Sequence, residues 1–126
     1  MSAPPSLQPG IERTHEFTVE GRLVTNVGGT IEASVLSTPG MISMMEYAAA
    51  RLVRDQLPPG HATVGFEVCI KHVGGVLEGA TCTVTARLRE VVDERKLHFD
   101  VEVREGERTI GVGTHERRVV PITRRA

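Results

Sequence analysis

One long stretch of helix-forming residues, from Thr38 to Leu57, constrains the fold of this chain more than any other feature. It opens with Thr38 as the predicted N-cap and Pro39 at the first helical position, and it stops at Pro58-Pro59-Gly60. The first three turns are apolar nearly all round, and polar side chains gather only in the last turns. A helix of this kind has to be enclosed by other structure.

After Gly60 the sequence alternates between apolar and polar residues with a period of two, as half-buried β-strands do. Strands are predicted over 15–19, 22–25, 63–72, 80–91, 96–104 and 109–120. Asp93-Glu94 and Glu105-Gly106 are short enough for hairpin turns, so the strands they join should be antiparallel neighbours. One helix followed by a four-stranded antiparallel meander predicts an α+β domain whose sheet wraps the helix. Its open strand edges favour dimerisation.

Composition excludes several classes of protein. The 126 residues include 15 Lys and Arg against 16 Asp and Glu, which argues against a general nucleic-acid binder. No apolar run approaches the ~20 residues that cross a bilayer, and the first ten residues lack the features of a secretory signal. We therefore expect no membrane partner. Two cysteines are too few for a disulfide framework, so we also expect a cytoplasmic protein. We expect a single domain over 11–121, a disordered N-terminal tail over 1–10 and a C-terminal tail over 122–126.

Glu46 is the most informative polar residue, because at about 100° per residue it shares a helix face with apolar side chains. A carboxylate on the apolar side of a helix is costly unless it is paired, hydrogen-bonded or functional. Burial would suit it to work as a base or a nucleophile near neutral pH. The alternative is a structural carboxylate satisfied by a backbone amide or by an arginine of the sheet, and the pattern leaves both open.

Thr38 and His72 are the next candidates for chemistry. Capping alone accounts for Thr38, but a helix N-terminus also offers N–H groups that suit an oxyanion or a phosphate. His72 closes a predicted strand before a glycine-rich loop, where an imidazole can face a cleft and move a proton or simply be exposed. A cleft role also stays open for His115. Cys69 and His72 are three residues apart and face opposite sides of a strand, so without a second ligand pair we predict no metal site.

Three blocks of sequence resemble the fluoroacetyl-CoA thioesterase-like branch of the hotdog superfamily. They are Ser37 to Ala49, Thr63-Val64-Gly65 with the strand to His72, and Ile110 to Arg117. The likeness spans about residues 10–120, in the same order and with similar spacings. It implies a hotdog fold, in which an antiparallel sheet wraps one long central helix, and a homodimer with active sites at the subunit interface. It also implies hydrolysis of an acyl-CoA substrate to the free acid and CoA, without a cofactor.

The resemblance implies site residues as well. Matched by motif, Thr38, Glu46 and His72 correspond to the family's catalytic set. Gly65 would lie beside the acyl group, and Arg117, otherwise ordinary solvated charge, would contact coenzyme A. The eight residues from Thr38 to Glu46 span about 12 Å of helical rise. Either the helix begins later than Thr38, or the substrate bridges the two, or one of them comes from the partner subunit, and the family favours an interface site.

Two segments depart from the family pattern. The loop over 73–79 reads VGGVLEG, where many relatives carry a Thr-Pro pair before the final glycine. Residues 21–36 contain no aromatic side chain, whereas fluoroacetate-specialised members carry phenylalanines before the catalytic threonine. We therefore expect a small or medium acyl group without selectivity for fluoroacetyl-CoA. Two other hypotheses stay open, namely a non-catalytic hotdog protein that binds acyl-CoA or a small ligand, and a structural dimer with no ligand.

Overall fold

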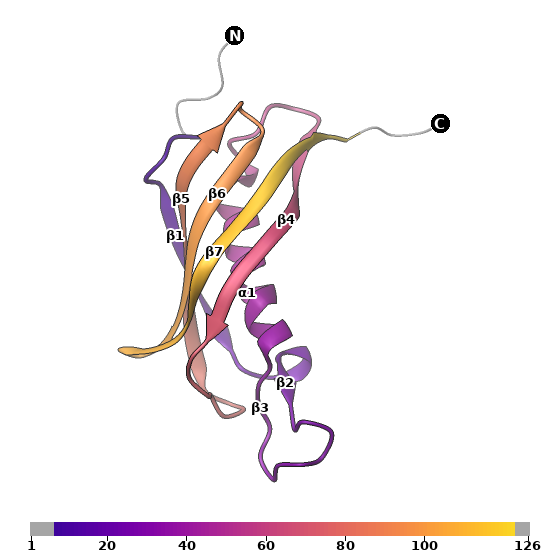
Figure 1. Ribbon diagram of the computed structural model, residues 1–126, viewed down its shortest axis with the longest axis vertical. Coiled ribbons are helices and arrows are strands. Elements are labelled where there is room, and N and C mark those ends of the chain that lie inside the picture. The colour runs from indigo at the N-terminus through magenta and orange to yellow at the C-terminus, as the bar shows by residue number, and fades with distance from the viewer. Residues whose placement is uncertain (1–6, 123–126) are drawn as a thin grey trace.

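The computed structural model describes residues 7–122. Within them one α-helix, α1 (Thr38–Arg54), lies across one face of a five-stranded antiparallel sheet (Figure 1). The strands of this sheet are β1 (Glu12–Thr18), β4 (His61–His72), β5 (Thr81–Val92), β6 (Lys96–Glu105) and β7 (Arg108–Pro121). Before the helix stand a 3-10 helix, η1 (Gly21–Leu23), and a ribbon of two short strands, β2 (Val24–Thr25) and β3 (Val35–Leu36). The predicted α+β fold, with an antiparallel sheet around one long helix, is confirmed.

The strand order differs from the predicted four-stranded meander. Strands β5, β6 and β7 are hairpin-connected antiparallel neighbours, as predicted, but the sheet order is β1-β5-β6-β7-β4. Strand β4 pairs with β7 instead of β5, and β1 occupies the other side of β5. The connection over 73–80 carries the chain from β4 at one edge towards the opposite side of the sheet. The predicted adjacency of β4 and β5 was therefore wrong, because alternating hydrophobicity identifies strands but not their partners.

The helix begins with a different cap from the predicted one. Ser37 is the N-cap, and its Oγ accepts the backbone N–H of Gly40 at 2.9 Å. Thr38 is therefore the first helical residue and Pro39 the second. Both Ser and Thr cap helices well, so two adjacent candidates cannot be separated by residue type. The C-cap is Asp55, so the helix also ends earlier than the predicted Leu57.

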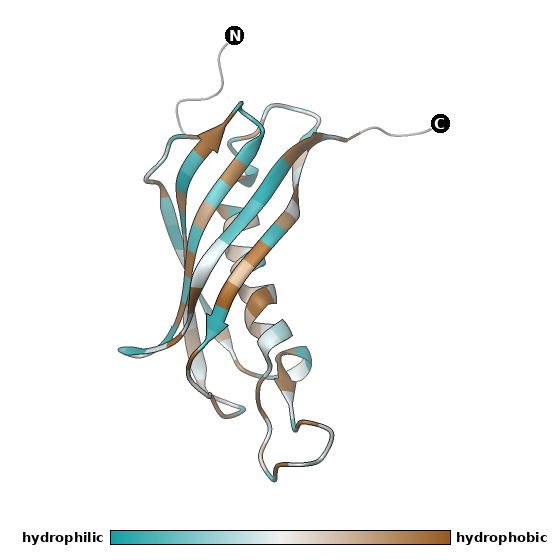
Figure 2. Ribbon diagram, viewed as in Figure 1, coloured by the Kyte–Doolittle hydropathy of each residue, from teal (hydrophilic) through white to brown (hydrophobic). Residues whose placement is uncertain are grey.

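The core lies between the helix and the sheet. Alternate residues of β5 and β6 are buried, and the bands of colour along these two strands in Figure 2 show the matching alternation of hydrophobic and hydrophilic residues. The buried side chains of β5 and β6 are Cys82, Val84, Ala86, Leu88, Leu97, Phe99, Val101 and Val103. The helix contributes Met41, Met44 and Met45. A Cβ at Gly111 would lie 2.3 Å from Sδ of Met41, so the helix approaches β7 as closely as a missing side chain permits.

The ordered part of the chain begins before the predicted residue 11. Leu7 is buried in the core, and the backbone N–H of Gly10 donates to the carbonyl of Leu88 at 2.7 Å. Apolar burial thus fixes the last residues of the predicted N-terminal tail. Residues 1–6 of that tail and 123–126 of the predicted C-terminal tail lie outside the described residues. Between 7 and 122, no helix is long and apolar enough to cross a membrane.

Candidate active site

Thr38 and His72 meet where the start of the helix lies beside the end of β4. Oγ1 of Thr38 and Nδ1 of His72 are 2.8 Å apart, which is hydrogen-bonding distance. Because Ser37 caps the helix, the Thr38 hydroxyl is free for this contact. His72 is half-buried. The alternative roles left open by the sequence therefore do not hold: Thr38 is not the helix cap, and His72 is not simply exposed.

The pair opens onto a groove of about 330 Å³. The other lining residues are Val35, Leu36, Val73, Gly74 and Gly75. The loop after His72 is held in place, because Val73 and Gly74 donate to the carbonyl of Ile110 and Arg108 donates to that of Gly75. Nε2 of His72 is buried and has no hydrogen-bond partner among residues 7–122. One nitrogen of the imidazole thus contacts a hydroxyl, and the other is buried without a partner in the described part of the chain.

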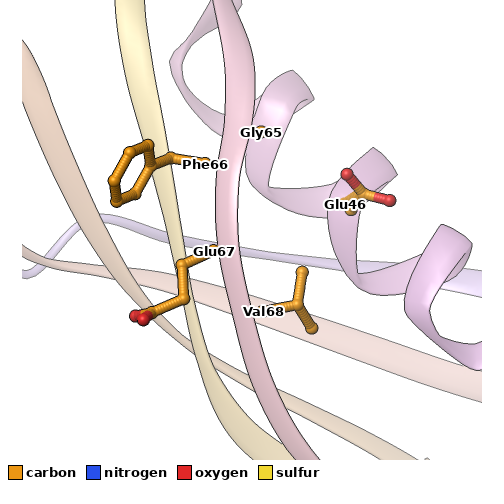
Figure 3. A pocket seen from close by; sticks show the side chains of 5 residues that line it. All are labelled: Glu46, Gly65, Phe66, Glu67 and Val68. Atoms are coloured by element: carbon orange, nitrogen blue, oxygen red, sulfur yellow. The ribbon is translucent and has the colours of Figure 1, made fainter.

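Glu46 lies further along α1, at a second cavity of about 310 Å³ (Figure 3). The lining residues are Glu46, Gly65, Phe66, Glu67 and Val68. The predicted burial of Glu46 does not hold in the single chain, where its side chain is 42% exposed. Its Oε2 lies 3.9 Å from Nη1 of Arg117. Pairing with an arginine of the sheet, the alternative left open by the sequence, is thus observed, and the carboxylate remains accessible from the cavity.

Gly65 gives the Glu46 carboxylate its room. A Cβ at Gly65 would lie 2.9 Å from Oε2 of Glu46, closer than real Cβ atoms come to such neighbours. The helix side chain therefore rests directly on the backbone of β4. Gly65, which was predicted to lie beside the acyl group, and Glu46, the predicted catalytic carboxylate, therefore line the same cavity.

A β-bulge in β4 puts Gly65 and His72 on the same face of the sheet. Residues seven apart face opposite sides of a regular strand, but the β4–β7 register shifts between Gly65 and Glu67. In Figure 3, Phe66 and Glu67 both lie on the far side of β4 from the helix, whereas Val68 lies between strand and helix. This bulge was not predicted from the sequence. A glycine in the middle of a strand was the signal that could have revealed it.

Arg117 is buried, although it was predicted to be either solvated or in contact with coenzyme A. Its Nε donates to Oγ1 of Thr63 at 2.8 Å and its Nη2 to the Thr63 carbonyl at 3.0 Å. Nη1 lies 3.3 Å from Nε2 of His115. Burial lowers the pKa of Arg117, and the nearby Glu46 carboxylate opposes that effect. Within the single chain its partners are thus residues of its own fold, and the contact with coenzyme A stays a prediction.

The three residues matched by motif do not all meet within one chain. Thr38 and His72 are hydrogen-bonded, whereas Glu46 is about 12 Å of helical rise away and lines a separate cavity. The helix begins at Thr38, which removes the possibility of a later start. Two of the predicted arrangements remain: either a substrate bridges the two cavities, or one of the residues comes from a second subunit. Across the part of the chain described, no three His, Cys, Asp or Glu side chains are grouped to hold a metal ion.

The model of one protein family, described as FlK, fluoroacetyl-CoA-specific thioesterase, matches residues 19–123. The chain belongs to this family. It is 40% identical over 86 residues to a fluoroacetyl-CoA thioesterase from Streptantibioticus cattleyicolor. That match covers 68% of this chain but only 61% of the relative, so the chain spans about three fifths of the length of this curated FlK relative.

Solved structures share the fold of this FlK family member. A structure of FlK itself aligns with a TM-score of 0.82 and 32% identity, covering 91% of this chain and 89% of that one. A variant of FlK in complex with fluoroacetate and CoA gives 0.81 and 33%, covering 90% and 95%. A thioesterase superfamily member from Thermus thermophilus gives 0.81 and 25%, covering 91% and 85%. The predicted hotdog fold and the resemblance to this thioesterase family are confirmed.

Proposed function

We propose that this protein is an acyl-CoA thioesterase that hydrolyses a small or medium acyl-CoA to the free acid and coenzyme A. The observation that carries the proposal is the hydrogen bond between Thr38 and His72 at the mouth of a groove. Because Ser37 caps the helix, the Thr38 hydroxyl is not needed as the N-cap. The names of the relatives supply the class of reaction.

The working unit we propose is a homodimer joined at β4. The outer edge of this twelve-residue strand is unpaired within residues 7–122, and it exposes Val64 by 49% and Phe66 by 57%. Open edges with apolar side chains favour pairing with another chain. Glu46 and Gly65 lie beside this edge. A second copy on β4 would cover the half-exposed carboxylate and complete the site across the interface.

In the proposed reaction Glu46 acts on the thioester carbonyl, either as the nucleophile or as the base that activates water. A C–O bond forms at the carbonyl carbon, and backbone N–H groups near a helix end or at Gly65 bind the oxyanion. The C–S bond then breaks, its electron pair leaves with sulfur, and His72 delivers a proton to the thiolate. If Glu46 attacks directly, water hydrolyses the resulting anhydride. Thr38 orients the imidazole through the contact with Nδ1.

The acyl group we propose is small or medium, without preference for fluoroacetyl. Selecting fluorine over hydrogen requires close contact with one atom of the acyl group. The segment 26–34, between β2 and β3, offers only Val27 and Ile31 as large apolar side chains. It carries no aromatic ring that could make such a contact.

A non-catalytic protein that binds acyl-CoA or another small ligand is the second candidate. The observation that favours it is the loop over 73–79, which lacks the Thr-Pro pair and is pinned by Arg108 to the carbonyl of Gly75. Such a protein would bind CoA esters tightly and release no thiol.

A thiol-release assay over acetyl-, propionyl-, butyryl-, hexanoyl- and fluoroacetyl-CoA tests the proposal. Wild type should turn over at least one ester, and Glu46→Gln, Thr38→Val and His72→Gln should each lose about a hundredfold or more. Glu12→Gln on β1 and Thr85→Val on β5 are matched controls that should keep full turnover. Full turnover by Glu46→Gln would overturn the catalytic assignment. Calorimetric binding of CoA esters without thiol release would establish the binding protein.

We also propose that the chain acts through a single domain, which includes the buried Leu7 as well as the predicted residues 11–121, that hydrolysis needs no cofactor, and that the protein works in the cytoplasm. Cys69 and Cys82 are both free, as a reducing compartment would keep them. Turnover that survives dialysis against a chelator would agree with the absence of a metal requirement. Turnover lost on dialysis and restored by a metal ion would contradict it.

A further inference from the structure

His115 is buried beneath the cavity of Glu46. It is 2% exposed and lies on β7, opposite Val68 of β4 and Phe99 of β6. Its Nδ1 lies 2.7 Å from the carbonyl oxygen of Glu67, and its Nε2 lies 3.3 Å from Nη1 of Arg117. Because a carbonyl oxygen only accepts, Nδ1 carries the proton and Nε2 offers a lone pair to the guanidinium. The two contacts fix the tautomer and the orientation of the ring.

The Arg117 guanidinium is held at each of its nitrogens. Nε and Nη2 both donate to Thr63, at 2.8 Å to Oγ1 and 3.0 Å to the carbonyl. Nη1 lies between Nε2 of His115 at 3.3 Å and Oε2 of Glu46 at 3.9 Å. A buried guanidinium anchored from two sides has little freedom to turn. Its charge is directed at the Glu46 carboxylate.

We infer that His115 and Thr63 are positioning residues that hold Arg117 against Glu46, so that Arg117 orients the Glu46 carboxylate for the reaction. This rests on the proposed function, because it assigns a support to the proposed catalytic carboxylate. A glutamate side chain is flexible, and catalytic groups need locked partners to keep a productive geometry. A contact of Arg117 with coenzyme A would compete with these anchors for the same nitrogens.

The geometry requires a neutral His115. A proton on Nε2 would point an N–H group at Arg117, which is itself a donor. The groups that face His115 are Arg117 on β7, Glu46 on α1, the Glu67 carbonyl on β4 and the Phe99 ring on β6 at 6.1 Å. Burial lowers the pKa of His115, the Glu67 carbonyl raises it, Arg117 lowers it and Glu46 raises it, with a net lowering. The ring therefore stays an acceptor for Arg117 at neutral pH.

Steady-state kinetics of Thr63→Val test the inference, since valine keeps the shape of threonine and removes the acceptor for Nε. We expect kcat to fall by about tenfold and KM to change by less than about twofold, because the carboxylate is misplaced while substrate binding is kept. The matched control, Thr85→Val, removes a 2.9 Å hydrogen bond to Thr14 on the outer part of the same sheet and should change neither constant. If Arg117 serves coenzyme A instead, Arg117→Lys would raise KM and leave kcat intact, which would overturn the inference.

A second measurement does not depend on turnover. Nitrogen-15 NMR of the His115 side chain should show a proton on Nδ1 and an unprotonated Nε2 at neutral pH, and Thr63→Val should shift the Nε2 resonance. If wild type hydrolyses no ester but this shift occurs, the anchoring of Arg117 stands and the proposed function fails. If wild type hydrolyses esters and both Thr63→Val and His115→Gln match its rate, the inference fails and the proposed function stands.

Discussion

The Glu46 carboxylate rests on the backbone of Gly65, so that a methyl group at Gly65 would lie 2.9 Å from Oε2. The atom in conflict is the far end of a flexible side chain, which can move while the helix and strand stay in place. Gly65 is also absent from the glycines with positive φ, so its backbone suits any residue. A side chain at this position would therefore displace the carboxylate without disturbing the fold.

Gly65→Ala should consequently separate activity from stability. We expect thiol release to fall at least about tenfold, because the carboxylate leaves its place, while the free energy of unfolding changes by less than about 1 kcal/mol. Gly113→Ala is the contrasting variant, since its Cβ would lie 2.2 Å from the backbone oxygen of Cys69 and should cost about 1–3 kcal/mol. Urea unfolding and the thiol assay measure both quantities. Unchanged turnover in folded Gly65→Ala would remove Glu46 from the reaction.

Ser37 and Thr38 should show opposite effects, although they are adjacent hydroxyl residues. Ser37→Ala removes the N-cap and should cost about 1 kcal/mol of stability with turnover retained. Thr38→Val leaves the cap intact but removes the contact with His72, so it should abolish most turnover with little loss of stability. Thr38→Ser, which keeps a hydroxyl, is the control and should retain measurable activity. Equal kinetic losses in Ser37→Ala and Thr38→Val would mean that the helix start acts only as scaffold.

The sequence was sufficient for the helix and the long strands, but not for the short elements η1 and β3 before the helix or for the pairing of the strands. Periodicity placed the helix and the long strands within a few residues, because burial on one face leaves a local pattern. Pairing of β4 with β7 depends on contacts between segments that are distant in the chain, and alternation carries no trace of them. The family resemblance, which rests on motifs, singled out Thr38, Glu46 and His72 as candidates where periodicity alone left alternatives open.

Details of the site depended on geometry that no local pattern encodes. The bulge after Gly65 reverses which residues of β4 face the helix, and a one-residue change of phase is invisible without the partner strand. The exposure of Glu46 likewise depends on what covers β4. Arg117 resembled solvated charge in sequence, because its anchors, Thr63 and His115, are brought to it only by the folded sheet.

Charge on the outer edge of β4 should break the proposed dimer. Val64→Asp places a carboxylate on an exposed position of this strand, where it costs a monomer little but would be desolvated in an interface. Light scattering after gel filtration should show a dimer for wild type and a monomer for Val64→Asp, with turnover lost in parallel. Ile31→Asp, at a similarly exposed position outside β4, should remain dimeric. A monomeric wild type with full turnover would leave a substrate bridging the two cavities as the remaining arrangement.

Stability should fall on mild acidification, because His115 is held neutral by its surroundings. The unfolded chain takes up this proton near pH 6.5, and the folded chain only at lower pH, since burial lowers the pKa of His115. Between those values the unfolded state binds more protons, so the free energy of unfolding decreases as pH falls.

His15 adds an effect of the same sign, because burial, then Arg13 and Arg51, lower its pKa. Urea unfolding of wild type, His115→Gln and His15→Gln from pH 8 to 5 should show a shallower slope in each variant. Because His115→Gln loses buried contacts at every pH, the slope and not the level is decisive, and a slope equal to wild type would show that His115 titrates normally in the folded protein.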